Sequence, residues 1–132
     1  MSELIIAYDF GTSGVKAILI DREGNIISTS EESYPLLNPK PLYVEQSTDD
    51  YWHAVCNVTK KAMANAGKSP EQVKGISFSV QAYNTIPVDK DGNVLHNAIS
   101  WLDGRAQEEA EAINRACGAE LVRSQDFQCR MM

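Results

Sequence analysis

The sequence predicts an α/β domain in which a mixed sheet carries helices packed on it. Apolar, strand-like runs open the chain at Leu4–Tyr8, Val15–Asp21 and Asn25–Ser30. A stretch with helical spacing of its apolar residues follows between Ser47 and Gly67. The run VKGISFSVQ, at residues 73–81, then predicts a fourth strand directly after that helix. A meander of strands followed by alternating helix and strand is typical of a mixed sheet.

Composition limits the classes of protein to which the chain can belong. Its 132 residues suffice for one domain with a core, and 43% of them are hydrophobic. A formal net charge of −6 disfavours nucleic-acid binding, which needs a basic surface. The sequence has neither a secretory signal pattern nor an apolar run of membrane-spanning length. Cys56, Cys117 and Cys129 are widely spaced, which indicates reduced thiols. We therefore expect a cytoplasmic protein with no nucleic-acid or membrane partner.

The first two strands are joined by the short link FGTSG, residues 10–14, which predicts a β-hairpin. We expect Gly11 and Gly14 to adopt positive φ and to let the backbone approach a ligand. Thr12 and Ser13 add hydroxyl donors beside backbone N–H groups, so the turn can form an anion site. The triplet Asp-Phe-Gly here is not that of a protein kinase, because only eight residues precede it and no HRD follows.

The later elements are predicted from caps and turn residues. Ser47 is a natural N-cap for the first helix and Gly67 a natural stop. Residues 85–100 predict a second hairpin around the turn DKDGN. A last helix is expected over residues 103–118, capped by Asp103 and ended by Gly118.

Four segments together resemble the N-terminal region of the FGGY carbohydrate kinases, including xylulose and glycerol kinases. The segments are IIAYDFGTSGVKAILIDREGNII, YPLLNPKPLYVEQSTDDYW, VKGISFSVQ and VDKDGNVLHNAISWLDGRAQEE. They stand in the family's order and run from about Leu4 to about Ile113. The resemblance implies a ribonuclease-H-like fold of the actin-like ATPase superfamily. Residues 1–132 would form the N-terminal part of the first lobe, with the second lobe absent.

The resemblance also implies a reaction: phosphoryl transfer from ATP to a hydroxyl of a sugar or polyol. Asp9 would act on a magnesium ion, often through water, because a hard cation prefers oxygen ligands. Gly11, Thr12 and Ser13 would meet the β- and γ-phosphates, and Lys16 would lie near the transferred phosphate. The alternative for each residue is purely structural: a strand end, a set of satisfied turn amides, and a solvated strand lysine.

The acceptor side would lie at VQAYN and WLDGR. The implied substrate residues are Gln81, Tyr83, Asn84, Trp101, Asp103 and Arg105. Polar side chains there suit a polyol, because a site built for hydroxyls rejects ligands that leave its groups unpaired. In xylulose kinases the segment that corresponds to VQAYN reads roughly Gln-Met-His-Gly, so Tyr83 stands where those enzymes have a histidine. The identity of the sugar is therefore left undetermined. Structurally, Asp103 could serve only as a helix cap, Arg105 as the ion partner of a nearby acid and Trp101 as core.

The family's second aspartate, the general base, has no match in this sequence. We therefore expect a fragment that does not phosphorylate sugar alone and that exposes surfaces favouring a homodimer or strand exchange. Two alternatives stay open. One is another kinase of the actin-like superfamily, and the other is a non-catalytic binding module whose turn glycines serve geometry alone.

Overall fold

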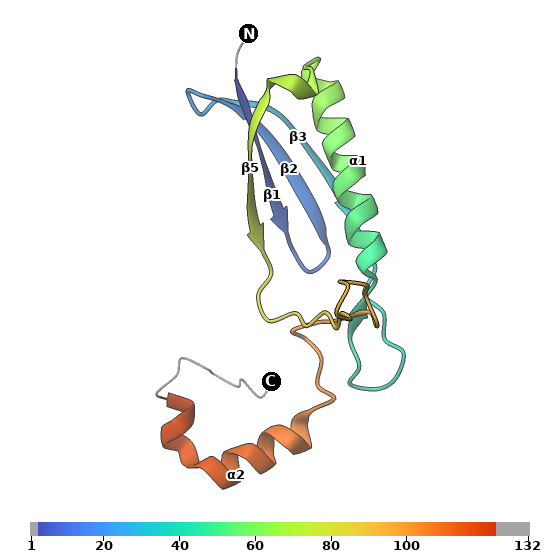
Figure 1. The fold of residues 1–132 in the computed structure, drawn as a ribbon, viewed down its shortest axis with the longest axis vertical. Coiled ribbons are helices and arrows are strands. Elements are labelled where there is room, and N and C mark those ends of the chain that lie inside the picture. The colour runs from blue at the N-terminus through green and yellow to red at the C-terminus, as the bar shows by residue number, and fades with distance from the viewer. Residues whose placement is uncertain (1–2, 124–132) are drawn as a thin grey trace.

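The computed structural model describes residues 3–123, with side chains as far as residue 116. Its centre is a four-stranded sheet in the order β3-β2-β1-β5 (Figure 1). The strands are β1 (Leu4–Phe10), β2 (Gly14–Asp21), β3 (Ile26–Ser33) and β5 (Val73–Val80). β1, β2 and β3 form an antiparallel meander, whereas β5 lies parallel to β1. The predicted mixed sheet is confirmed, with the β1–β2 hairpin at its centre.

Helix α1 (Thr48–Ala66) supplies the crossover that a parallel β5 requires, and it packs along one face of the sheet (Figure 1). Its ends are those predicted from the sequence. The Ser47 side chain accepts a hydrogen bond from the Asp50 amide, which satisfies one of the unpaired N–H groups of the first turn. Gly67 ends the helix in the left-handed region at φ 58°, where a residue without Cβ is unstrained.

The core lies between α1 and the meander. Along β1, Leu4, Ile6 and Tyr8 are buried while Ile5 is 40% exposed, as the two-residue period of a strand requires. Ser28 and Ser30 on β3 donate hydrogen bonds of 2.7 and 2.6 Å to carbonyls of α1, which fixes the helix against that strand. The buried hydrophobic cluster comprises Leu4, Ile6, Tyr8, Val15, Ala17, Leu19, Tyr34, Ala54, Val58, Ala62 and Met63.

Smaller elements complete the chain. The short strands β4 (Glu45–Gln46) and β6 (Ala98–Ile99) form an antiparallel pair. They lie at the end of the sheet where the turn connects β1 to β2 (Figure 1). A 3-10 turn, η1 (Pro70–Gln72), leads into β5. The last helix, α2 (Gln107–Arg123), extends away from the sheet (Figure 1).

One sequence-based expectation on this part of the chain was confirmed and one was wrong. Residues 85–100 fold back around the DKDGN turn as expected, held by antiparallel bridges between Thr85 and Ile99 and between Val88 and Val94, while β6 also pairs with β4. α2 begins at Gln107, so Asp103 is not its cap, and it continues through Gly118. A single glycine costs a helix only about 1 kcal/mol, which is too little to end it where other residues favour helix.

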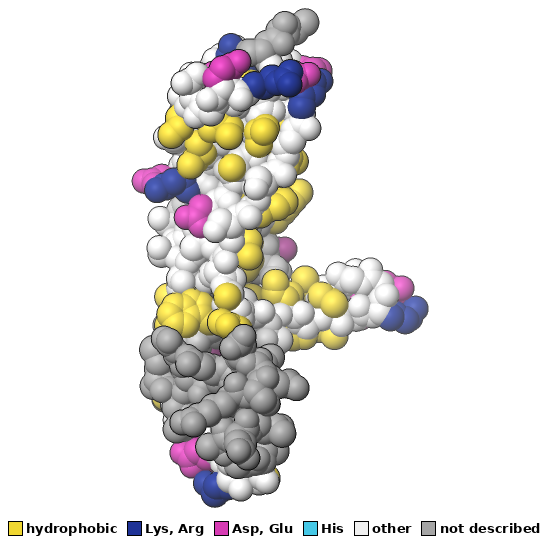
Figure 2. All heavy atoms as spheres, turned by 90° about the vertical axis from the view of Figure 1, so that its left-hand side faces the viewer, with side chains coloured by type: hydrophobic (Ala, Val, Ile, Leu, Met, Phe, Trp, Pro, Cys, Tyr) yellow, Lys and Arg dark blue, Asp and Glu magenta, His cyan; other side chains and the backbone are white. Residues whose placement is uncertain are grey.

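Beyond the cover of α1, the sheet exposes apolar side chains. Ile76, Phe78 and Val80 on β5 are each more than 60% exposed, and Phe78 stacks on Tyr8 at 5.7 Å between ring centroids. Figure 2 shows hydrophobic side chains gathered on the side of the molecule that carries β5. Within residues 3–123, neither helix has the length and apolar character needed to cross a membrane.

Candidate functional site

The turn between β1 and β2 borders an open hollow. Asp9 and Lys16 are direct partners in the β1–β2 register, so both side chains leave the sheet on the same face. The Asp9 side chain is exposed. The hollow has a volume of about 290 Å³ and is lined by Asp9, Gly11, Ser13, Gly14, Val15, Lys16, Glu31, Glu32 and Ser33. Of the sequence-predicted phosphate residues, only Thr12 is missing from this lining.

Three carbonyl groups of the turn are held by other parts of the chain. The Tyr34 hydroxyl donates to the Gly11 carbonyl over 2.6 Å, and the Tyr34 amide donates to the Ser13 carbonyl over 3.2 Å. Gln46 Nε2 donates to the Thr12 carbonyl over 2.8 Å. Among the described residues, the amides of Thr12 and Ser13 have no hydrogen-bond acceptor. The turn therefore keeps its acceptors occupied and its donors available, as an anion-binding turn requires.

The glycines of the turn serve a different purpose from the one expected. Neither Gly11 nor Gly14 has positive φ, so the expectation of left-handed conformations was wrong. Gly14 is required by close packing instead, because a Cβ there would lie 2.5 Å from the Glu32 carbonyl oxygen. At Gly11 a Cβ would meet only the Gly14 oxygen, at an ordinary 3.5 Å. Absence of a side chain at Gly14 thus lets β3 approach the turn.

The charge of the hollow is mostly negative. Asp9, Glu31 and Glu32 line it together with one cation, Lys16. Glu32 is neutralised by Lys61 at 2.7 Å, whereas Lys16 lies 3.8 Å from Glu31 and both are largely exposed. Such a lining repels a bare polyphosphate and accepts one that carries a divalent cation.

The residues that line the hollow suit a magnesium ion whose remaining ligands are water and phosphate oxygens. Within residues 3–123, no group of three or more His, Cys, Asp or Glu side chains could hold a metal ion by itself. Magnesium is usually bound through one or two carboxylates, with water and substrate phosphates as the other ligands. Asp9, an exposed carboxylate beside unpaired amides, matches that pattern, whereas Glu31 and Glu32 lie near Lys16 and Lys61.

Burial keeps the anchoring phenol of Tyr34 protonated. Its side chain is only 6% exposed, and burial raises the pKa of Tyr34 to about 12, with Tyr51 and Asp9 adding to the shift. The hydroxyl is therefore a permanent donor to the Gly11 carbonyl at all physiological pH values.

The structure brings three of the expected acceptor residues to the same turn. Trp101 Nε1 donates to the Thr12 hydroxyl over 3.0 Å, and the Trp101 amide donates to Asn84 Oδ1 over 3.0 Å. The amide groups of Gln81 and Asn84 both contact the Tyr51 hydroxyl at 3.4 Å. Trp101 thus bonds directly to the turn, while Asn84 bonds to the Trp101 amide and shares the Tyr51 hydroxyl with Gln81.

Tyr83 is the most exposed of the expected acceptor residues. Its side chain is 82% exposed and its backbone has φ 64°, a left-handed conformation that residues with a side chain rarely adopt. Strain of this kind persists only where neighbouring structure imposes it, and it clusters at functional sites. The strained position supports interpretation of this turn as a ligand contact.

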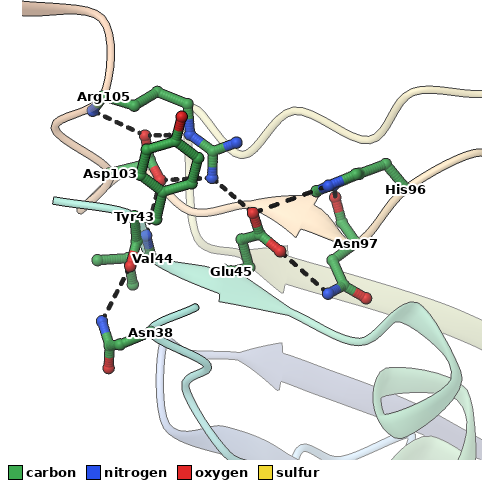
Figure 3. Close-up of polar contacts among 8 residues, drawn as sticks. All are labelled: Asn38, Tyr43, Val44, Glu45, His96, Asn97, Asp103 and Arg105. Atoms are coloured by element: carbon green, nitrogen blue, oxygen red, sulfur yellow. Dashed lines mark hydrogen bonds and ion pairs between the residues drawn. The ribbon is translucent and has the colours of Figure 1, made fainter. Parts of the chain in front are cut away.

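Asp103 and Arg105 are not among the residues that line the hollow, and they form a compact ion cluster with Glu45 (Figure 3). The Arg105 guanidinium donates one hydrogen bond of 2.8 Å to each carboxylate oxygen of Asp103, and one of 2.7 Å to Glu45. It also lies over the Tyr43 ring, 3.9 Å from the centroid. Asp103 accepts a further bond of 2.7 Å from the Val44 amide. The cluster fastens the WLDGR segment to β4.

Hydrogen bonds control ionisation within this cluster. The side-chain bond from Arg105, followed by that from Asn97, holds the pKa of Glu45 below its ordinary value despite burial. Burial raises the pKa of Asp103, but hydrogen bonds from Arg105 and from the Val44 amide outweigh it and leave the pKa lowered. Both acids pull the pKa of Arg105 upward. All three groups are charged at neutral pH.

The sequence-based reasoning missed Tyr34, Glu45, Gln46 and Tyr51. The first three lie in residues 34–46, a segment with three prolines whose irregular spacing gives no periodic signal, and Tyr51 lies in the first turns of α1. No local signal marks Glu45 and Gln46, which are followed by the polar Ser47 and are buried and bonded only through tertiary contacts.

Comparison with known proteins places these features in context. Residues 4–132 match the model of the FGGY family of carbohydrate kinases, N-terminal domain. The chain is 36% identical to a glycerol kinase of Thermococcus gammatolerans over 118 residues, which are 89% of this chain and 24% of the relative. It is 36% identical to a xylulose kinase of Klebsiella pneumoniae over 110 residues, which are 83% of this chain and 22% of the relative.

Comparison with solved structures also finds a carbohydrate kinase. The gluconate kinase of Lactobacillus acidophilus superposes with a TM-score of 0.83 at 25% identity, over 93% of this chain and 25% of that chain. The chain therefore spans about a quarter of the length of the relatives it matches. Those three relatives are named for three different acceptors.

Proposed function

Because this chain belongs to the FGGY family of carbohydrate kinases, we propose that it is the N-terminal part of the first lobe of an enzyme that phosphorylates a sugar or polyol with ATP. The observation that carries the proposal is the β1–β2 hairpin, which joins an exposed carboxylate, available amides and an open hollow. Phosphoryl transfer demands such parts, because its catalysis consists mainly of positioning and charge neutralisation.

Each residue of the hairpin has a defined task in this proposal. Asp9 holds the magnesium ion, directly or through a water molecule. The turn from Gly11 to Ser13 donates hydrogen bonds to the β- and γ-phosphates. Lys16, opposite Asp9 and 52% exposed, supplies positive charge near the transferred phosphate. Bound magnesium would neutralise phosphate charge against the acidic lining of the hollow.

The acceptor is proposed to bind beside this hairpin, along the segments that carry Gln81, Tyr83, Asn84 and Trp101. The exposed Tyr83 ring and the Trp101 indole offer aromatic faces to the C–H groups of a sugar, and amides offer hydrogen bonds to hydroxyls. Asp103 and Arg105 act indirectly here, since their mutual bonds fix the loop on which Trp101 lies.

The general base is proposed to come from sequence outside these 132 residues. Asp103 is a poor base because it is buried, bonded to Arg105 and has a lowered pKa. Asp9 is committed to the metal. The relatives are about four times as long as this chain, which leaves ample sequence for a second lobe and a second aspartate.

The proposal is tested with the complete reading frame that contains these residues. The purified product is screened for ADP formation with ketoses, polyols, sugar acids and acetate. Phosphorylation of one sugar or polyol, abolished by Asp9→Asn, supports the proposal. Activity on acetate alone favours another kinase of the actin-like superfamily. An inactive protein in which Asp9→Asn alters only stability favours a non-catalytic binding module.

A further inference from the structure

A closed ring of hydrogen bonds joins the phosphate hairpin to the acceptor segments. Trp101 Nε1 donates to Thr12 Oγ1 at 3.0 Å, and Gln46 Nε2 donates to the Thr12 carbonyl at 2.8 Å. Tyr51 donates its hydroxyl proton to Gln46 Oε1 at 2.7 Å. Asn84 closes the ring, because its amide group reaches Tyr51 at 3.4 Å and its oxygen accepts the Trp101 amide at 3.0 Å.

The chemistry of the indole sets the direction of the bond at Thr12. An indole N–H is a donor only, so the Thr12 oxygen must accept from Trp101. The proton of the Thr12 hydroxyl is then free to be donated elsewhere. Since the amides of Thr12 and Ser13 are also unpaired donors among residues 3–123, an oxyanion is the partner that all three groups suit.

Packing alone does not explain why Trp101 lies there. The side chain is 41% exposed, so burial of the ring is incomplete. Gln46, the other residue that bonds to Thr12, differs from Trp101 in its burial. It is 1% exposed, and both the nitrogen and the oxygen of its side-chain amide are hydrogen-bonded. A buried amide with fixed partners holds the Thr12 backbone while the indole orients the hydroxyl.

Next to this ring of hydrogen bonds, the side-chain oxygen of Gln81 lacks a hydrogen-bond donor within the part of the chain that the structure describes. Gln81 Nε2 approaches Gln46 Oε1 and the Tyr51 hydroxyl at 3.3 and 3.4 Å. Its oxygen, Gln81 Oε1, is buried and has no hydrogen-bond partner among the described residues. A buried acceptor is normally bonded, so a donor such as a polyol hydroxyl would complete it.

We propose that Trp101 is a positioning residue for Thr12: its indole N–H turns the Thr12 hydroxyl into a donor for a phosphate oxygen and couples the acceptor segments to the nucleotide site. This inference rests on the proposed function. It assigns to Trp101 a role toward the nucleotide, in addition to its contact with the acceptor, and makes Gln46 and Tyr51 supports of that role.

The test uses the product of the complete reading frame and two matched substitutions. Trp101→Phe keeps an aromatic ring but removes the N–H, while Trp52→Phe makes the same change on α1, where the side chain is 67% exposed. Binding of MgATP and of adenosine is measured by calorimetry without any sugar. Trp101→Phe should weaken MgATP binding about five- to tenfold, the effect of one hydrogen bond, and leave adenosine binding unchanged. Trp52→Phe should change neither.

A double-mutant cycle identifies Thr12 as the intermediary. Thr12→Val removes the hydroxyl at nearly constant shape, so Trp101→Phe should cost nothing more in that background.

The outcomes separate this inference from the proposed function. Additive losses in the cycle, or equal losses of MgATP and adenosine binding, overturn the coupling and leave Trp101 a structural residue, even if a sugar is phosphorylated. A folded protein that binds no MgATP overturns both proposals. Strict non-additivity confined to MgATP supports both.

Discussion

Asp9 and Lys16 lie directly opposite one another on β1 and β2, with opposite charges on the same face of the sheet. The two residues flank the turn whose amides are unpaired and whose carbonyls are held by Tyr34 and Gln46. A cross-strand acid and base usually neutralise one another, but here Lys16 is 3.8 Å from Glu31 instead. Asp9 is left available to a cation, and this arrangement motivates the predictions below.

Substitution of Gly14 by alanine should destabilise the fold. The added Cβ would lie 2.5 Å from the Glu32 carbonyl oxygen, and backbone cannot move aside as a flexible side chain does. The cost should be about 1–3 kcal/mol, as for other overpacked sites. Urea unfolding measures it, with Gly11→Ala as the control, since that Cβ meets an ordinary contact at 3.5 Å. Equal stability of the two variants would contradict the packing described for β3.

The two faces of β1 should respond differently to the same truncation. Ile6 is 2% exposed in the core and its neighbour Ile5 is 40% exposed on the opposite face. Ile6→Ala should lower the free energy of unfolding by about 2–5 kcal/mol, and Ile5→Ala by distinctly less. Chemical denaturation of both variants checks the register. A larger loss for Ile5 would mean that the buried face has been misidentified.

Acid should weaken the fold through the cluster of Glu45, Asp103 and Arg105. The folded-state pKa values of Glu45 and Asp103 lie below their ordinary values of 4.5 and 3.8. A depressed carboxyl pKa stabilises the folded state above the unfolded-state value and ceases to do so as pH falls through the folded-state value. The urea midpoint should therefore be level at neutral pH and fall below about pH 4.5.

A Glu45→Gln variant provides the control for that titration. It should be less stable than the parent at pH 7, because Arg105 loses an ion partner, and its midpoint should fall less steeply in acid. Identical pH profiles for the two proteins would show that Glu45 does not contribute to the acid dependence.

The 132-residue chain by itself should produce no ADP in a sugar-dependent manner. It carries the carboxylate and the turn that we propose bind metal and phosphate, but no candidate for the general base among the described acceptor residues. A coupled assay over the same acceptors, with the complete product as positive control, measures this directly. Turnover by the short chain would remove the need for a second lobe.

Local signals predicted much of the fold. The hairpin over residues 4–21, the capped helix from Ser47 to Gly67 and the strand VKGISFSVQ all follow from periodicity, caps and turn residues, and the structure contains each of them. The prediction failed where distant contacts override local preference. Asp103 looks like a helix cap, yet its carboxylate accepts hydrogen bonds from Arg105 and the Val44 amide instead.

The candidate site was predictable only where its residues are close together in the sequence. Asp9, Thr12, Ser13 and Lys16 are contiguous, so one motif identifies them, and their roles stay predictions. The supports Tyr34 and Gln46 come from segments more than 20 residues away and meet the turn only through tertiary structure. Their contribution could not be read from spacing. Trp101 was expected near a sugar, whereas its bond to Thr12 emerges only from the folded chain.

Affinity for MgATP in proteins with and without the Asp9 carboxylate addresses the central claim most directly. Calorimetry would compare the complete product with Asp9→Asn and with Asp49→Asn, an exposed acid in the first turn of α1. With magnesium present, Asp9→Asn should bind ATP about ten- to a hundredfold more weakly, the effect of losing a charged ligand, and Asp49→Asn should bind normally. Equal, magnesium-dependent affinity in all three proteins would contradict a nucleotide site at this hairpin.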